Sequence, residues 1–172
     1  MNVSLSCTLL LVVGAALTLA GCWGEDAAAD RTSGGGLVEA RSGSALAGFV
    51  NIKRRHGTIK LFLNVLGAPP GEHAVRLHQV GDCSALDASS AGSFWSPEGS
   101  AAGDGVSLGD LGNLRVDESG RGYLAFSTGA WGFGDGTEFD LVGRALVIHQ
   151  KSAELLVGED GSDARIGCGV IR

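Results

Sequence analysis

The sequence has little positive charge. Its 172 residues include 13 Lys and Arg against 19 Asp and Glu, which gives a formal net charge of −6. The only basic run is Lys53-Arg54-Arg55, and we expect it to form a solvated turn. Nucleic-acid-binding domains carry an excess of Lys and Arg on one face. The composition therefore argues against a nucleic-acid partner.

The sequence also lacks a hydrophobic run long enough for a membrane-spanning helix. The apolar run at residues 9–17 is shorter than the roughly 20 residues that such a helix needs. No charged side chain occurs before Cys22, and the segment ends in Leu19-Ala20-Gly21-Cys22. A short apolar segment that ends in small residues predicts a secretory signal.

The Leu-Ala-Gly-Cys ending resembles the bacterial lipobox, although no Lys or Arg precedes the apolar run. The resemblance implies a signal peptide at residues 1–21 and lipidation of Cys22. The alternative is an ordinary signal peptide cleaved nearby. We expect a lipid anchor to hold the protein on a membrane of the bacterial cell envelope, periplasmic or surface-facing.

Few cysteines remain after the predicted processing. Cys7 leaves with the signal and Cys22 accepts the lipid, so Cys83 and Cys168 are left. Two cysteines in an oxidising compartment predict one disulfide. A metal site built on this pair would need further Cys or His nearby in the sequence.

No amphipathic helix longer than a turn or two is visible, and the pattern indicates β-structure. Residues 22–36 are polar and Gly-rich, which predicts a flexible tether. Residues 84–109 are rich in Ser, Gly and Ala, which predicts a long loop. Alternating apolar residues predict strands at 45–52, 58–66, 122–127, 144–151 and 165–171, and residues 71–83 are predicted to form a strand followed by a turn. Many short strands joined by Gly-rich turns favour an antiparallel sandwich or barrel.

The stretch at residues 71–83 combines two His, an Arg and a Cys. Because side chains alternate along a strand, His73 is expected to face the core together with Val75 and Leu77. Arg76 and His78 then share the outer face, where we expect any chemistry to occur.

Five separated segments together resemble the Cu/Zn superoxide dismutase family. They are residues 70–85, residues 90–97 (Ser-Ala-Gly-Ser-Phe-Trp-Ser-Pro), residues 109–114 (Gly-Asp-Leu-Gly-Asn-Leu), residues 143–149 and residues 164–171. The resemblance covers residues 37–172. It implies an all-β domain, an eight-stranded antiparallel Greek-key β-barrel with long loops that hold the metals outside the barrel wall.

The same resemblance assigns the metal positions. The copper positions fall on Arg76, His78, Phe94 and His149. Of the zinc positions, one falls on Ser107, Asp110 is kept, and no His lies between Pro97 and Ser107. An Asp that links the two sites in the family falls near Ala153.

His78, His149 and Asp110 are therefore residual ligands, the first two for copper and the third for zinc. Arg76 cannot be deprotonated to bind a metal, and Phe94 cannot bridge two metals. We expect no cofactor or weakly bound copper, and no zinc. The alternative role for His78 and His149 is hydrogen bonding to each other, to water or to Asp110.

Two further roles follow from the resemblance. His73 matches a buried histidine that braces the barrel by hydrogen bonds to the backbone. Arg165 matches the active-site arginine that guides superoxide to copper. The segment 152–163, which replaces the family's electrostatic loop, carries four acidic residues and no Lys.

The sequence thus predicts an exported lipoprotein with a dismutase-like domain that is catalytically degenerate and has a binding or structural role in the envelope. One alternative is a superoxide dismutase with a rearranged or copper-only site. Another is a chaperone-like partner of a true dismutase. The sequence leaves open the oligomeric state and any protein partner.

Overall fold

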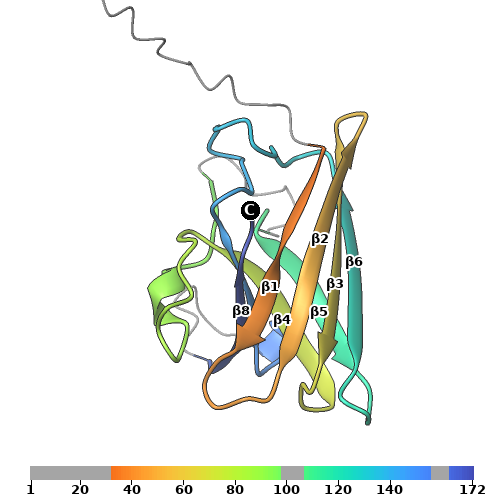
Figure 1. Ribbon diagram of the computed structural model, residues 1–172, viewed down its shortest axis with the longest axis vertical. Coiled ribbons are helices and arrows are strands. Elements are labelled where there is room, and N and C mark those ends of the chain that lie inside the picture. The colour runs from red at the N-terminus through yellow and green to blue at the C-terminus, as the bar shows by residue number, and fades with distance from the viewer. Residues whose placement is uncertain (1–31, 98–106, 156–162) are drawn as a thin grey trace, which may run out of the picture.

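The described residues form a closed antiparallel β-barrel. The computed structural model describes residues 32–97, 107–155 and 163–172. Around the barrel the strand order is β1-β2-β3-β6-β5-β4-β7-β8 (Figure 1). The strands are β1 Ser33–Ala40, β2 Ala47–Arg55, β3 Thr58–Leu66, β4 Gly71–His78, β5 Asp110–Val116, β6 Gly122–Thr128, β7 Ala145–His149 and β8 Arg165–Val170. The neighbours β3/β6 and β4/β7 are not consecutive in the chain, which gives Greek-key connectivity and confirms the predicted fold.

Alternating side chains fill the barrel interior. In β3, which has the bounds predicted from the sequence, Ile59, Leu61 and Leu63 are fully buried. Their neighbours in the chain point away from the core because successive side chains in a strand face opposite sides. Val75 and Leu77 of β4 are also buried, as the alternation predicts.

The first four residues of β1, residues 33–36, lie within the predicted tether. Ser33 is already paired with Lys53 of β2. A side chain at Gly34 or Gly36 would collide with the backbone of the C-terminal segment, at the carbonyl oxygens of Arg172 and Val170. The glycines therefore allow close strand contact, and the predicted tether is wrong for residues 33–36. Residues 22–31 lie outside the described residues.

β5 also lies where the alternation predicts no strand. Its buried residues Leu111, Leu114 and Val116 do not keep a spacing of two. The register with β4 shifts, since Ala74 is opposite Asn113 while Arg76 is opposite Asp110. This β-bulge inserts an extra residue and interrupts the period-two alternation that predicts a strand.

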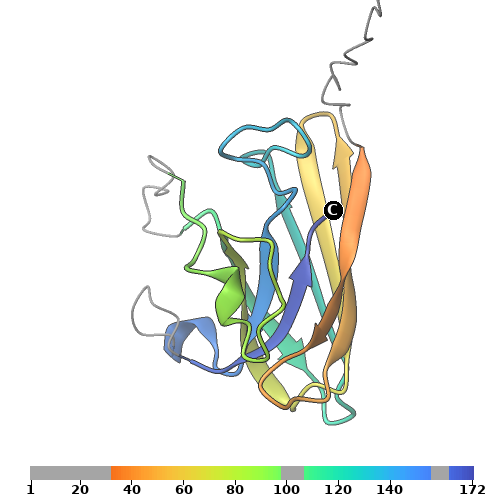
Figure 2. The ribbon, with the colours of Figure 1, turned by 60° about the vertical axis from the view of Figure 1, so that its left-hand side comes forward.

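The described part of the predicted long loop covers the outer side of β7 and β8. We call residues 83–97 the covering segment. It contains a single 3₁₀ turn, η1 (Ser89–Ala91), and lies beside the barrel (Figure 2). Ala88 and Ala91 pack on Ala145, Val147 and Cys168 in a small apolar cluster separate from the barrel core. All five residues of β7 are consequently buried.

The predicted disulfide is present. Cys83, at the start of this covering segment, bonds to Cys168 of β8, with their Cα atoms 5.7 Å apart. The bond fixes the covering segment to the barrel wall.

Helical structure is sparse in residues 32–97, 107–155 and 163–172. It consists of η1 and a second 3₁₀ turn, η2 (Ala153–Leu155). Over these residues, no helix is long and apolar enough to span a membrane.

Candidate functional site

The candidate site lies outside the barrel wall, between β4, β7, β8 and the covering segment. His78 ends β4, and its bridge to Phe94 brings the covering segment alongside that strand. The backbone N–H of Trp95 donates to the carbonyl of Leu77 at 2.8 Å. His78 lies on the outward side as predicted, yet it is fully buried because this segment covers it.

The two residual copper ligands contact each other. The Nε2 atoms of His78 and His149 are 3.3 Å apart, and the rings stack with centroids 5.5 Å apart. His78 Nδ1 lies 2.9 Å from the carbonyl oxygen of Gly92, to which it donates. In a neutral ring Nε2 then accepts, so the network assigns the shared proton to His149 Nε2.

That assignment leaves the other nitrogen of His149 without a proton. His149 Nδ1 is buried and has no hydrogen-bond partner among the described residues. No hydrogen-bond donor in the described part of the chain faces His149 Nδ1, so one of the four ring nitrogens of the pair has no hydrogen bond there.

Burial keeps both imidazoles neutral. It is the largest cause of the fall in the pKa of His78 to about 4; Arg165 and Arg76 lower it further, and the Gly92 hydrogen bond opposes the shift. Burial likewise dominates the fall in the pKa of His149 to about 3, followed by His78 and the two arginines. Both rings are uncharged at neutral pH, which is the form of imidazole that binds metals.

Arg76 fills the first copper position with its own side chain. One guanidinium nitrogen, Nη2, lies 3.2 Å from Asp110 Oδ2. The guanidinium carbon lies 4.5 Å from the centre of the Phe94 ring, within the range of a cation–π contact. The other oxygen of Asp110 accepts the N–H of Gly112 at 2.9 Å. The residues at the bridging and zinc positions thus hold Arg76.

Phe94 also packs against both histidines. Its ring meets His78 edge-on at a centroid distance of 5.0 Å and His149 at 5.6 Å. An apolar ring therefore takes the place between the residual copper ligands and Arg76. It adds to the burial that keeps the imidazoles neutral.

Arg165 begins β8 opposite His149, which brings it to the predicted place. Its Nη1 donates to the carbonyl of Ala88 at 2.8 Å. Burial lowers its pKa from the ordinary arginine value while Asp87 opposes the shift, and the side chain stays cationic at neutral pH. The acidic residues at 159 and 160 lie outside the described residues.

Ser107, at a zinc position, and Ala153, near the position of the Asp that links the two metal sites in the family, take part in loop hydrogen bonds. Ser107 Oγ donates to the carbonyl of Trp95 at 3.2 Å. The backbone N–H of Ala153 donates to the side chain of Asn113 at 2.7 Å. Asp110 is engaged by Arg76, so these positions do not form a zinc tetrahedron.

The donor set does not fit a copper–zinc centre. Within the described residues, no group of three or more His, Cys, Asp and Glu could hold a metal ion. Linear two-coordinate copper between His78 and His149 would require their Nε2 atoms to be about 4 Å apart, given metal–nitrogen distances of about 2 Å. They are 3.3 Å apart, at hydrogen-bond distance.

His73 has the geometry of the predicted brace. Its ring is buried, with Nε2 2.8 Å from the carbonyl oxygen of Pro69. Nδ1 lies 2.9 Å from the Gln150 oxygen and 3.1 Å from the His149 oxygen. The side chain therefore links β4 to the end of β7 and fixes the backbone of His149.

Comparison with known proteins agrees with this barrel. The family described as copper/zinc superoxide dismutase matches residues 46–171. The chain belongs to the Cu/Zn superoxide dismutase family. It has the eight-stranded antiparallel barrel that the resemblance implies.

The relatives include dismutases and copper chaperones. The chain is 29% identical over 146 residues to superoxide dismutase [Cu-Zn] of Schizosaccharomyces pombe, covering 76% of this chain and 92% of that protein. It is 30% identical over 116 residues to the copper chaperone for superoxide dismutase of Rattus norvegicus, covering 61% of this chain. It spans only 40% of the length of that chaperone.

A solved structure matches the fold. The crystal structure of the clock protein EA4 superposes with a TM-score of 0.69 at 23% identity, covering 83% of this chain and 94% of that one. At this level of identity the likeness concerns the fold alone.

The sequence did not indicate two backbone groups of the site. The carbonyls of Gly92 and Ala88 hold His78 and Arg165. Backbone acceptors have no side-chain signature, so only the path of the covering segment shows their position.

Proposed function

We propose that this protein is an exported lipoprotein whose dismutase-like barrel is catalytically degenerate and has a binding or structural role in the cell envelope. The observation that carries the proposal is Arg76, seated between Asp110 and Phe94 in the first copper position. A guanidinium remains protonated and has no lone pair to offer a metal.

The neighbouring groups support the same conclusion. A Cu(II) centre favours imidazole nitrogens in a near-square arrangement, and two of the four positions are Arg76 and Phe94. The two imidazoles that remain are joined to each other by a hydrogen bond between their Nε2 atoms. Binding copper there would break this bond and displace buried side chains.

Export is supported by the sequence before the barrel and by the disulfide. The Leu-Ala-Gly-Cys ending places a lipid acceptor at Cys22, and the Cys83–Cys168 bond is typical of proteins in oxidising compartments. Labelled palmitate should appear on the wild-type protein and be lost in Cys22→Ser.

Metal content and superoxide turnover test the degenerate site. The protein should be produced by secretion, loaded with copper and zinc, freed of excess metal and assayed beside an active dismutase treated identically. We expect substoichiometric metal, no turnover above the buffer rate and an unchanged circular dichroism spectrum. Near-stoichiometric copper together with superoxide turnover would overturn the proposal.

A copper-only dismutase is the second candidate. It is favoured by two neutral imidazoles that face each other and by Arg165 beside them. It requires copper binding that is lost in His149→Gln and kept in His56→Gln, a control in an exposed turn. Copper binding of equal strength in both variants would exclude these histidines as the site.

A third candidate is a docking partner of an active dismutase, favoured by the 30% identity to the copper chaperone for superoxide dismutase. Size-exclusion chromatography of the chain mixed with an active dismutase from the same organism tests it. A new, earlier peak containing both proteins would favour docking, and two independent peaks would exclude a stable complex.

A further inference from the structure

The barrel side opposite the covering segment exposes large apolar side chains. The register places Leu37, Phe49, Asn64 and Tyr123 in one row across β1, β2, β3 and β6. Leu37 is 73% exposed, Phe49 45% and Tyr123 57%. Figures 1 and 2 show the covering segment on another side of the barrel, away from β2, β3 and β6.

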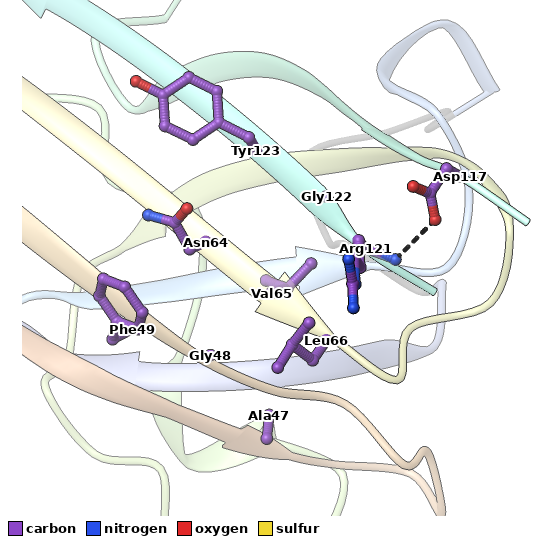
Figure 3. A pocket seen from close by; sticks show the side chains of 10 residues that line it. All are labelled: Ala47, Gly48, Phe49, Asn64, Val65, Leu66, Asp117, Arg121, Gly122 and Tyr123. Atoms are coloured by element: carbon purple, nitrogen blue, oxygen red, sulfur yellow. Dashed lines mark hydrogen bonds between the residues drawn. The ribbon is translucent and has the colours of Figure 1, made fainter. Parts of the chain in front are cut away.

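A shallow groove lies in this surface. Phe49, Leu66 and Tyr123 are among the residues around a cavity of about 640 Å³ (Figure 3). They come from β2, β3 and β6, and their side chains project from the outward side of the sheet. An exposed apolar patch with a polar surround is typical of an interaction surface.

The same side of the sheet becomes basic toward the β2–β3 turn. Lys53 and Lys60 are directly opposite each other, and Arg55 follows at the end of β2. All three are exposed. In residues 32–97, 107–155 and 163–172, none of the three forms an ion pair. We call the seven residues Lys53, Arg55, Lys60, Leu37, Phe49, Leu66 and Tyr123 the amphipathic face.

The chain toward Cys22 leaves the barrel beside this basic end. Ser33, the first residue of β1, is paired with Lys53. Ten residues, 23–32, separate it from Cys22, and ten residues span at most about 35 Å when fully extended. A lipid on Cys22 would therefore hold the basic end of the face close to a bilayer.

We propose that the amphipathic face lies on an anionic membrane surface, with its basic residues on lipid phosphates and its apolar residues at the headgroup boundary. The proposal rests on the lipid anchor included in the proposed function, and it does not depend on whether the barrel binds copper. Lys and Arg are attracted to anionic leaflets, and aromatic side chains favour the membrane interface.

Charge complementarity selects this orientation. The protein has a formal net charge of −6, so most of its surface is repelled by anionic lipid. The amphipathic face joins the only basic run to exposed apolar residues. Two acidic residues lie near this face. Glu39 on β1 is paired with Arg41 at 3.2 Å, and Asp117, which lines the groove together with Arg121, accepts the backbone N–H of Arg121 at 3.0 Å.

The three lysines of the chain allow a direct test. Lys53 and Lys60 belong to the face, whereas Lys151 lies elsewhere and pairs with Asp163 at 3.5 Å, which makes it an internal reference. The lipidated protein is placed in nanodiscs of phosphatidylcholine, with or without phosphatidylglycerol. Amine-labelling rates of each lysine are then measured by mass spectrometry.

We expect phosphatidylglycerol to slow labelling of Lys53 and Lys60 relative to Lys151 by at least about threefold, and high salt to reverse the effect. Arg55→Gln should weaken this protection. Arg115→Gln is the matched control, because it also removes one exposed strand arginine and keeps all three lysines. Arg115 lies on β5, outside the face.

The remaining outcomes separate the alternatives. Anchored protein with equal labelling ratios in both lipids overturns the orientation and leaves the anchor intact. Protection that is already present in detergent overturns it in favour of a second copy of the chain on this face. Protein that lacks palmitate on Cys22 and does not insert into nanodiscs overturns the anchor, and with it the proposal built on it.

Discussion

At the residue scale, Arg76 organises the contacts of the candidate site. Asp110, which the resemblance assigns to zinc, is the counterion of its guanidinium. Which metal positions lack a ligand could be predicted from the sequence, because the resemblance assigns most of these positions to particular residues of this chain, and the type of each residue shows whether it can bind a metal. The contacts among Arg76, Asp110 and Phe94 could not, because they depend on how the covering segment folds over β4.

Asp110→Asn tests the strength of this ion pair. Both side chains are mostly buried, at 16% and 20% exposure, and Arg76 Nε already lacks a hydrogen-bond partner among the described residues. We expect the free energy of unfolding in urea to fall by about 1–2 kcal/mol, because a partly buried cation loses its charged partner.

Glu39→Gln is the control for that measurement. Glu39 also pairs with an arginine at 3.2 Å, but its side chain is 68% exposed. Surface pairs contribute about 0–1 kcal/mol, so this substitution should cost less than Asp110→Asn. Equal losses in the two variants would show that Arg76 does not depend on Asp110.

The buried histidine pair makes stability depend on pH. The pKa values are about 4 for His78 and about 3 for His149 in the folded protein, below the ordinary value of 6.5. Between these limits the unfolded chain binds protons that the folded protein does not. Stability is therefore full above pH 6.5 and falls as the pH drops toward 4, by up to about 1.4 kcal/mol per pH unit for each histidine.

Urea unfolding at intervals from pH 7 to pH 5 measures this slope. In His78→Gln/His149→Gln the contribution of the pair is absent, so the curve should be flatter than that of the wild type. Parallel curves for the two proteins would contradict the buried neutral pair.

At the element scale, a strand is predicted accurately where apolar and polar residues alternate strictly, and poorly where they do not. β3 keeps strict alternation from Thr58 to Leu66, and both of its ends match the bounds that the sequence predicts. β1 begins with glycines that permit close backbone contact, and β5 contains a bulge. Both features remove the period-two signal, so these strands could be inferred only from the resemblance to the family.

The disulfide connects two elements that the sequence separates by 85 residues, the covering segment and β8. Closing a loop of that length in the unfolded chain is worth about 4 kcal/mol if the effect is entropic. Cys83→Ser/Cys168→Ser should therefore unfold at markedly lower urea concentration than the oxidised wild type. Adding a thiol reductant should lower the urea midpoint of unfolding of the wild type and leave the midpoint of the double variant unchanged. A wild type that is insensitive to reduction would contradict this role.

At the scale of the whole molecule, strand pairing closes the barrel around a hydrophobic core. Its buried residues come from seven of the eight strands and from the segments that close the ends, and β6 adds the partly buried Leu124 and Phe126. Arg76 and Phe94, at two of the copper positions that the resemblance implies, lie outside that core. The core of the barrel is thus separate from the candidate metal positions.

This separation predicts that thermal stability does not depend on metal. A ligand raises the melting temperature only when it binds the folded state more tightly than the unfolded state. Calorimetry of the wild type should therefore give the same Tm after chelation and after loading with copper and zinc. Arg76→His/Phe94→His offers four imidazoles again, and copper at 100 times its Kd would stabilise that variant by about 2.7 kcal/mol, or several degrees. Phe94→His alone keeps Arg76 in place and should show no such gain. A metal-dependent Tm in the wild type would contradict the filled site, and a double variant that does not respond to copper would mean that the covering segment no longer supports the ligand geometry.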